Sequence, residues 1–279
     1  MGAVVSVCPV SGPRRPWRGP GERARRARRT DEEIPVTGGR PDRTAAWEDR
    51  GMSEQRGAGT DHGDQGGDVV AAWEALVATA RRTVADGLVV GTSGNVSVRV
   101  GGTVLVTPSG VPYDRLTPDD VTGVDLDGRQ VLGTLVPTSE LPLHLAVYEA
   151  TDARAVVHTH AVHATAVSTL VDELPLVHYM AAALGGPVRV APYATYGSAE
   201  LAANALRALD GRSGCLLRNH GTLTHGTDLD QAYDRTAQLE WMCRVWLTAS
   251  SVPHLTPTLL TPAQLAEVTE KLRGYGQRG

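Results

Sequence analysis

The sequence has no long apolar run and few cysteines. No stretch approaches the roughly 18 consecutive apolar residues that a membrane-spanning helix requires, which argues against an integral membrane protein. The three cysteines, Cys8, Cys215 and Cys243, have the spacing of neither a metal-binding motif nor a disulfide framework. We therefore expect a reducing, cytoplasmic location.

Positive charge is not in excess either. The 27 lysines and arginines are outnumbered by 31 aspartates and glutamates, which gives a formal net charge of -4 and a pI near 6.1. This balance argues against a general nucleic-acid binder, because such proteins carry excess positive charge for the phosphate backbone. The chain does have apolar content: 41% of its 279 residues are hydrophobic, enough for a sizeable core in one or two domains.

The composition changes near residue 66. Residues 1–66 are rich in Arg, Gly and Pro, with eight arginines between Arg14 and Arg29, and show no sustained apolar periodicity. Such a segment cannot bury enough apolar surface to offset the entropy of ordering, so we predict a disordered extension over 1–66 and a folded domain over 67–279. The alternatives are an arm that binds nucleic acid or a membrane surface, a targeting peptide, and a true start at Met52, since Met52-Ser53-Glu54 resembles an ordinary cytoplasmic beginning.

From Asp68 onward the chain has the periodicities of an α/β domain. Apolar residues recur at helical spacing over 69–84, and Gly87 can end that helix. Val96, Val98 and Val100 alternate as in a strand, and glycine turns at 101–102 and 127–128 predict two hairpins. Further helices are expected near 139–150, 161–170, 198–209 and 229–249, and strands near 154–160, 187–191 and 214–218.

The last predicted helix has a clear start. Thr261-Pro262-Ala263-Gln264 is a capping box with proline at the first helical position. Early hairpins followed by mixed strands and helices predict a sheet covered by helices rather than a purely parallel, doubly wound fold.

Three histidines and a glutamate offer a metal-binding donor set. His158 and His160 lie two residues apart in a predicted strand, so their side chains point to the same face. Neutral imidazoles bind Zn²⁺, and His220 and Glu140 are the best candidates for completing a site that keeps one position open. The alternative is that these are core histidines, because a His-x-His pair also arises by chance. On these residues alone the two interpretations are equally good.

Three polar loops offer hydroxyls and free backbone N–H groups. They are 91–95, 107–110 and 137–140, and the third leads into the helix near 139–150. Together with the positive dipole end of that helix they can cradle a phosphate. Each loop taken singly is also an ordinary turn or helix cap. No lysine or arginine is obviously placed at this phosphate.

Several ordered motifs resemble one family. Residues 68–279 resemble the class II, metal-dependent aldolases of the fuculose-1-phosphate aldolase family. The resemblance is carried by Gly91-Thr92-Ser93-Gly94-Asn95-Val96-Ser97-Val98-Arg99, Thr107-Pro108-Ser109-Gly110-Val111-Pro112-Tyr113, Ser139-Glu140, Ala155-Val156-Val157-His158-Thr159-His160-Ala161-Val162-His163, His178-Tyr179-Met180, Ala191-Pro192-Tyr193-Ala194-Thr195-Tyr196-Gly197, Asn219-His220-Gly221 and Tyr275-Gly276. It implies a three-layer α/β/α fold with a mixed, largely antiparallel central sheet, and a homotetramer with active sites between subunits.

The resemblance also implies residue roles. His158, His160 and His220 match the zinc ligands, and Glu140 matches the general acid/base, which also touches the metal when substrate is absent. The residues matching the phosphate loops are Gly94, Asn95, Ser109, Gly110, Thr138 and Ser139. Tyr179 matches a tyrosine that reaches in from a neighbouring subunit to protonate the leaving aldehyde, and Tyr196 and Tyr275 match residues near the aldehyde pocket.

The expected activity is aldol cleavage of a ketose 1-phosphate, such as L-fuculose 1-phosphate or a 5-deoxy-pentulose 1-phosphate, to dihydroxyacetone phosphate and a small aldehyde. A divalent metal acts in this chemistry as a Lewis acid for the enediolate, and Glu140 serves as the proton shuttle if its pKa is tuned toward neutral. The single lysine, Lys271, lies in the last predicted helix, which argues against a Schiff-base mechanism. Histidine ligation suits Zn²⁺ but also Mn²⁺, Co²⁺ or Fe²⁺.

Relatives of this kind have three other functions, two of them enzymatic. The first is that of a ribulose-phosphate 4-epimerase, but such relatives have an aspartate at the position of Glu140. A methylthioribulose-1-phosphate dehydratase also has a glutamate there. A non-enzymatic, adducin-like interaction domain lacks the metal histidines, and this chain has all three. His163 is interpreted as a supporting or structural residue, and no role is assigned to His178 or His225.

Overall fold

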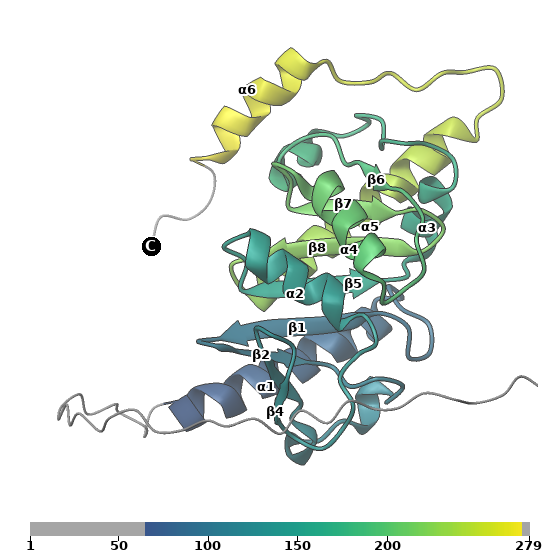
Figure 1. The fold of residues 1–279 in the computed structure, drawn as a ribbon. Coiled ribbons are helices and arrows are strands. Elements are labelled where there is room, and N and C mark those ends of the chain that lie inside the picture. Colours follow the sequence, from purple (N-terminus) through teal and green to yellow (C-terminus); the bar gives the residue numbers. More distant parts are fainter. Residues whose placement is uncertain (1–64, 275–279) are drawn as a thin grey trace, which may run out of the picture. The chain divides into compact units, whose positions relative to one another are not determined.

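The structure, a computed structural model, describes residues 65–274 (Figure 1). The predictions for the N-terminal extension fall on residues outside this range, apart from its last two residues, which begin the first helix. Tyr275 also lies outside the described residues. Of the helices between Gln65 and Leu272, none combines the length and the apolar character that a bilayer crossing demands.

In the described part of the chain, eight strands form one sheet. Their order across the sheet is β4-β3-β2-β1-β5-β8-β7-β6, and only β6 and β7 run parallel. The strands are β1 (Asn95–Val100), β2 (Thr103–Val106), β3 (Gly123–Asp125), β4 (Gln130–Leu132), β5 (Ala155–Thr159), β6 (Val190–Ala191), β7 (Gly214–Leu217) and β8 (Gly221–Gly226). The sheet is therefore mixed and largely antiparallel, as predicted.

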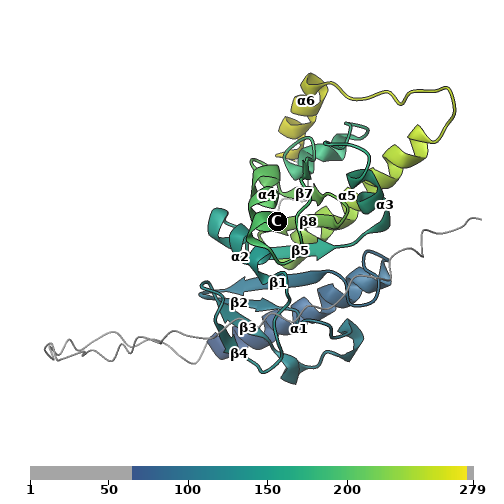
Figure 2. The same cartoon turned by 45° about the vertical axis from the view of Figure 1, so that its right-hand side comes forward.

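Helices cover both faces of this sheet. The α-helices are α1 (Gln65–Ala85), α2 (Leu141–Ala150), α3 (Val162–Ser168), α4 (Ala199–Leu209), α5 (Leu229–Ser250) and α6 (Pro262–Leu272), with 3₁₀ turns η1 (Tyr113–Arg115), η2 (Pro118–Asp120) and η3 (Tyr179–Leu184). Helices α2 and α4 pack on one face, while α1, α3 and α5 pack on the other (Figures 1 and 2). This is the expected three-layer arrangement.

Strand β5 shows how the apolar pattern builds these layers. Val156 packs with the α2 and α4 core, whereas Ala155 and Val157 pack with the α1 core. All three side chains are fully buried, because a central strand covered by helices has no solvent face. His158 has the same parity as Val156, so its side chain lies on the α2 face.

The predicted elements are confirmed, with two differences. The strand expected near 187–191 is only two residues long, Val190–Ala191. Strand β8 was missed, because Gly221-Thr222-Leu223-Thr224-His225-Gly226 has glycine at both ends and one large aliphatic residue. In the structure β8 pairs with both β5 and β7, and its buried threonine hydroxyls find partners: Thr222 lies 2.7 Å from Thr159, and Thr224 donates to the carbonyl of Ala232.

Candidate active site

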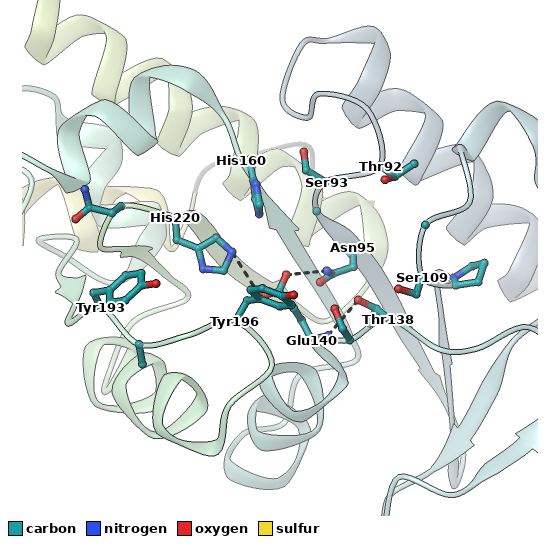
Figure 3. A pocket seen from close by; sticks show the side chains of 16 residues that line it. Thr92, Ser93, Asn95, Ser109, Thr138, Glu140, His160, Tyr193, Tyr196 and His220 are labelled. Atoms are coloured by element: carbon teal, nitrogen blue, oxygen red, sulfur yellow. Dashed lines mark hydrogen bonds and ion pairs between the residues drawn. The ribbon is translucent and has the colours of Figure 1, made fainter. Parts of the chain in front are cut away.

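Four side chains that are far apart in the sequence converge at one end of the central strands. One donor atom from each of Glu140, His158, His160 and His220 lies within 4.8 Å of the others. Nε2 of His158 is 3.0 Å from Glu140 Oε2 and 3.0 Å from His160 Nε2, and His220 Nε2 is 3.5 Å from Glu140 Oε1. Figure 3 shows His160, His220 and Glu140 facing the same cavity.

The fold brings these residues together through strand pairing. His158 is the next-to-last residue of β5, and His160 directly follows that strand. His220 lies in the tight turn between β7 and β8, where Asn219 takes a left-handed φ of 55° that asparagine tolerates better than most residues. Because β8 pairs with β5, this turn lies beside His158 and His160.

Glu140 enters the cluster from the start of α2. It is the N-cap residue of the helix, yet its side chain makes no capping hydrogen bond. The carboxylate instead turns toward β1, where Asn95 Nδ2 donates to its Oε2 at 3.1 Å. Glu140 Oε1 is buried and, within residues 65–274, has no hydrogen-bond partner. A buried carboxylate oxygen without a donor is costly unless a cation neutralises it.

The histidines also present the lone pairs that a cation needs. Nδ1 of His158 lies 2.7 Å from the carbonyl oxygen of Thr222, which can only accept, so Nδ1 carries a proton; in the neutral ring that binds a metal, the lone pair is then on Nε2. This contact orients the ring in the way that outer partners orient metal ligands. The unpartnered Glu140 oxygen and the convergent imidazoles fit a divalent cation.

The charge states agree with this interpretation. Burial lowers the pKa of His160 and of His220 to about 4, so both rings are neutral at physiological pH. Burial alone would raise the pKa of Glu140, but the nearby His158 and His220 and the hydrogen bond from Asn95 outweigh it and hold that pKa below its ordinary value. Glu140 is therefore a carboxylate, whereas the sequence interpretation had set a near-neutral pKa as the condition for its role.

A cavity of about 320 Å³ lies in front of the cluster. The predicted loops line it together: its walls are Thr92, Ser93, Gly94, Asn95, Pro108, Ser109, Gly110, Thr138, Ser139, Glu140, His160, Tyr193, Ala194, Tyr196, Asn219 and His220. All six residues predicted for phosphate binding are among them. No lysine or arginine of the described residues is in this wall, so a phosphate there would rely on hydroxyl and backbone donors.

Gly94 shows why the first loop needs glycine. Its φ is +81°, and a Cβ atom at this position would lie 2.7 Å from the carbonyl oxygen of His158. Both the left-handed backbone and the close approach to β5 exclude a side chain. The hydroxyl of Tyr113 donates to the carbonyl of Gly94 at 2.7 Å and holds the loop in place.

The predicted tyrosines are placed differently from one another. Tyr196 lines the cavity and is largely exposed. Tyr179 begins η3 and is not part of the cavity wall; its ring is half exposed and lies 4.4 Å from the ring of His178, centroid to centroid. A role for Tyr179 in this site would require a second subunit.

The three histidines without a proposed catalytic role in the sequence analysis, His163, His178 and His225, have structural partners. His163 and the start of α3 are bound by Glu240 of α5, which accepts from His163 Nδ1 at 2.6 Å and from two backbone amides. His178 stacks beside Tyr179 and Trp241, and Nε2 of His225 lies 3.2 Å from the carbonyl oxygen of Arg212.

Sequence reasoning missed several residues at this site. Tyr193 and Asn219 line the cavity, and both lie in motifs that carry the family resemblance, but the resemblance implied no role for them. His144, which is completely buried one helical turn beyond Glu140, is a third missed residue. Its spacing could have identified it, because a histidine four residues after a catalytic carboxylate lies on the same face of a helix.

The motifs, the mixed sheet and the four-residue cluster define a class. The chain belongs to the class II aldolase family: the family model described as Class II Aldolase and Adducin N-terminal domain matches residues 74–247. The resemblance inferred from the motifs is confirmed, and the chain is a lyase of the class II aldolase type. Members of this class are metal-dependent, in agreement with the histidine and glutamate cluster.

Individual relatives agree with this class. The chain is 41% identical over 194 residues to L-fuculose phosphate aldolase of Escherichia coli strain K12, covering 69% of this chain and 89% of that relative. It is 35% identical over 208 residues to 5-deoxy-D-ribulose 1-phosphate aldolase of Bacillus thuringiensis, covering 74% and 97%. Among solved structures, an L-fuculose 1-phosphate aldolase superposes with a TM-score of 0.70 at 33% identity, covering 73% of this chain and 96% of that one.

Proposed function

We propose that this protein cleaves a ketose 1-phosphate, namely L-fuculose 1-phosphate or a 5-deoxy-pentulose 1-phosphate, to dihydroxyacetone phosphate and a small aldehyde. One observation carries the proposal: Glu140, His160 and His220, three of the four members of the cluster, line the same cavity as the three hydroxyl-rich loops. A metal-binding group and an anion-binding group thus lie within reach of one small substrate. The relatives that bear these substrate names support the choice.

His158, His160 and His220 would hold the metal, with Glu140 as a further ligand when substrate is absent. Three neutral imidazoles and one carboxylate are a donor set typical of Zn²⁺, which we propose as the ion. A divalent cation held there supplies Lewis acidity for the negative charge that develops on the carbonyl and hydroxyl oxygens of the enediolate.

Glu140 would move the proton at C3 of the substrate. In the cleavage direction the C3–C4 bond breaks, its electron pair passes into the enediolate, and C3 then takes a proton. Glu140 Oε1 is the oxygen suited to exchange that proton, because Oε2 is engaged by Asn95, while Oε1 has no hydrogen-bond partner among residues 65–274 and lies 3.5 Å from His220 Nε2. In the direction of synthesis the same oxygen removes the proton, a role that suits the ionised form that its lowered pKa favours.

The phosphate would bind to the loops opposite the histidines. Gly94, Asn95, Ser109, Gly110, Thr138 and Ser139 line the cavity and would supply the hydroxyl, amide and remaining backbone N–H donors for the phosphate. The start of α2 adds the positive end of a helix dipole close to Ser139. No cation from a side chain is required, because several neutral donors share the charge.

The aldehyde would leave toward the aromatic rim. Tyr196 lines that side of the cavity, and we assign Tyr275 to the same pocket. Tyr179, from a neighbouring subunit, would exchange the proton of the C4 oxygen, which makes a homotetramer in the cytoplasm the proposed working form. The exposed ring of Tyr179 outside its own subunit's cavity is the feature that favours a contribution across an interface.

A coupled assay for dihydroxyacetone phosphate tests the function. Zinc-reconstituted protein is offered L-fuculose 1-phosphate and 5-deoxyribulose 1-phosphate, with and without chelator. Release that stops on chelation and returns with metal is the expected result. Consumption of substrate without dihydroxyacetone phosphate would replace the proposal by a dehydratase. No reaction here, with turnover of pentulose 5-phosphates, would replace it by an epimerase.

A further inference from the structure

A continuous row of buried polar groups leads away from Glu140 into the protein. Glu140 Oε2 accepts from Asn95 Nδ2 at 3.1 Å, and Asn95 Oδ1 lies 2.5 Å from His144 Nε2. His144 Nδ1 is 2.6 Å from Ser97 Oγ, which is 2.7 Å from the Tyr148 hydroxyl. All five side chains are at most 5% exposed. The inner part of the row, His144, Ser97 and Tyr148, is therefore isolated from competing water, while Glu140 and Asn95 form part of the cavity wall.

The row follows from the matching periods of a helix and a strand. Glu140, His144 and Tyr148 are four residues apart on one face of α2, about 6 Å per step. Asn95 and Ser97 are two residues apart on one face of β1, about 6.6 Å per step. Because the steps are nearly equal, the five side chains alternate between helix and strand. Asn95 also pairs across the sheet with His158, which places the end of the row at the metal cluster.

The direction of every hydrogen bond in the row is determined. An ionised carboxylate only accepts, so Asn95 must donate its N–H to Glu140 and accept through Oδ1. His144 Nε2 must then carry a proton. Burial lowers the pKa of His144 to about 3, so the ring is neutral and its Nδ1 is an acceptor. Ser97 therefore donates to Nδ1, and Tyr148 donates to Ser97. Every donor points toward Glu140.

We propose, resting on the function proposed above, that His144 is a positioning residue: its Nε2–H locks the Asn95 amide so that Nδ2 faces Glu140 Oε2 and Oε1 is left free for the metal and the substrate. A flipped amide would turn Oδ1 against the carboxylate, two acceptors facing each other. The second N–H of the locked amide is then directed elsewhere, and Asn95 lines the cavity in which we place the phosphate. Ser97 and Tyr148 act one step further back, by holding His144 in one tautomer.

The tautomer can be measured without any catalysis. Histidine-labelled protein, in which the variant His144→Gln identifies the signal among nine histidines, gives two-bond proton–nitrogen correlations for His144. We expect the Nε2–H form, and a shift toward the Nδ1–H form in Ser97→Ala. A predominant Nδ1–H form in the unmodified protein would overturn the proposal.

Enzyme kinetics test whether the positioning of Asn95 by His144 affects catalysis. Ser97→Ala and His144→Leu should lower kcat by about 10- to 100-fold, the range found for outer partners of metal ligands. His144→Gln, which keeps an N–H near the place of Nε2, should recover most of that loss. Thr236→Val is the matched control, because it removes a fully buried hydroxyl that hydrogen-bonds Thr224 away from the row. Zinc affinity, by calorimetry, is measured for each protein.

The outcomes separate the two proposals. If the unmodified protein cleaves no ketose 1-phosphate, the proposed function fails, while the tautomer and the zinc affinities still test His144. If Ser97→Ala is as active as the control, or if His144→Gln is as impaired as His144→Leu while both are folded by circular dichroism, His144 is structural and the positioning role is wrong.

Discussion

Glu140 divides its two carboxylate oxygens between different surroundings. Oε2 is held by Asn95 and lies 3.0 Å from His158, whereas Oε1 is buried 3.5 Å from His220 Nε2 and has no hydrogen-bond partner among the described residues. The side chain sits at the N-cap of α2 but does not cap the helix. Its position is therefore better explained by chemistry at the cavity than by helix stability.

Glu140→Gln should separate binding from turnover. The amide keeps the shape and the three histidines, so zinc should be retained, but it cannot exchange a proton at C3; we expect kcat to fall by about 10²- to 10⁴-fold, the usual contribution of a general base. Steady-state kinetics and metal analysis measure the two effects. Glu149→Gln, exposed on the same helix, is the control. Full activity in Glu140→Gln would remove this carboxylate from the mechanism.

His220→Ala should weaken zinc retention by orders of magnitude, because one of three proposed imidazole ligands is lost. His225→Ala changes a histidine five residues away, in β8, that contacts the carbonyl of Arg212 instead, and it should keep the metal. Zinc content after dialysis compares the two. Equal retention in both variants would contradict the three-histidine assignment.

Strand β8 is the element that assembles the site. It lies between β5 and β7 and begins one residue after His220. The strand packs closely against β5 at Gly221, where a Cβ atom would lie 2.0 Å from the carbonyl oxygen of Thr159. Any side chain there must push the β7–β8 turn away from the end of β5, and with it His220 away from His158 and His160.

Gly221→Ala should therefore damage both stability and metal binding. We expect a loss of about 1–3 kcal/mol in the free energy of unfolding, as for other overpacked sites, and a weaker zinc site. Gly102→Ala, in the β1–β2 turn where a Cβ meets nothing within 4 Å, is the matched control. Denaturant unfolding and zinc titration measure both quantities. A Gly221→Ala protein as stable and as zinc-competent as the control would show that the close contact is absent in solution.

Taken as a whole molecule, the folded domain holds several histidines neutral that the unfolded chain would protonate. Burial lowers the pKa of His160 and His220 to about 4 and that of His144 to about 3. Between these values and the ordinary histidine pKa near 6.5, the unfolded state binds more protons than the folded state. Stability therefore rises with pH through this window and falls as the pH is lowered through it.

The chelator-treated protein should accordingly lose thermal stability as the pH falls from about 6.5 toward 4. The effect is greatest in the lower half of that window, and the slope should be smaller in His144→Gln, which removes one of the three groups. Calorimetric Tm values at constant ionic strength measure the slope. A Tm that stays constant from pH 7 to pH 4.5 would contradict the neutral state of these rings.

Much of this protein is predictable from short stretches of sequence. The valine alternation predicts β1, the capping box at Thr261 predicts the start of α6, and the ordered motifs predict the family. These features depend on local periodicity, local hydrogen bonds and residue identity, all of which neighbouring residues determine. The residues alone left a metal site of Glu140 and three histidines and a set of core histidines as equally good interpretations, and the family resemblance decided for the metal site.

Tertiary structure decided the features that depend on pairing between distant segments. Strand β8 has weak local propensity and exists because β5 and β7 satisfy its backbone on both sides and other residues satisfy its threonine hydroxyls. The alternating row from Tyr148 to Glu140 likewise needs α2 laid along β1 in one register. Neither can be read from local pattern, because a buried polar side chain is stable only when its partner, remote in the chain, is already in place.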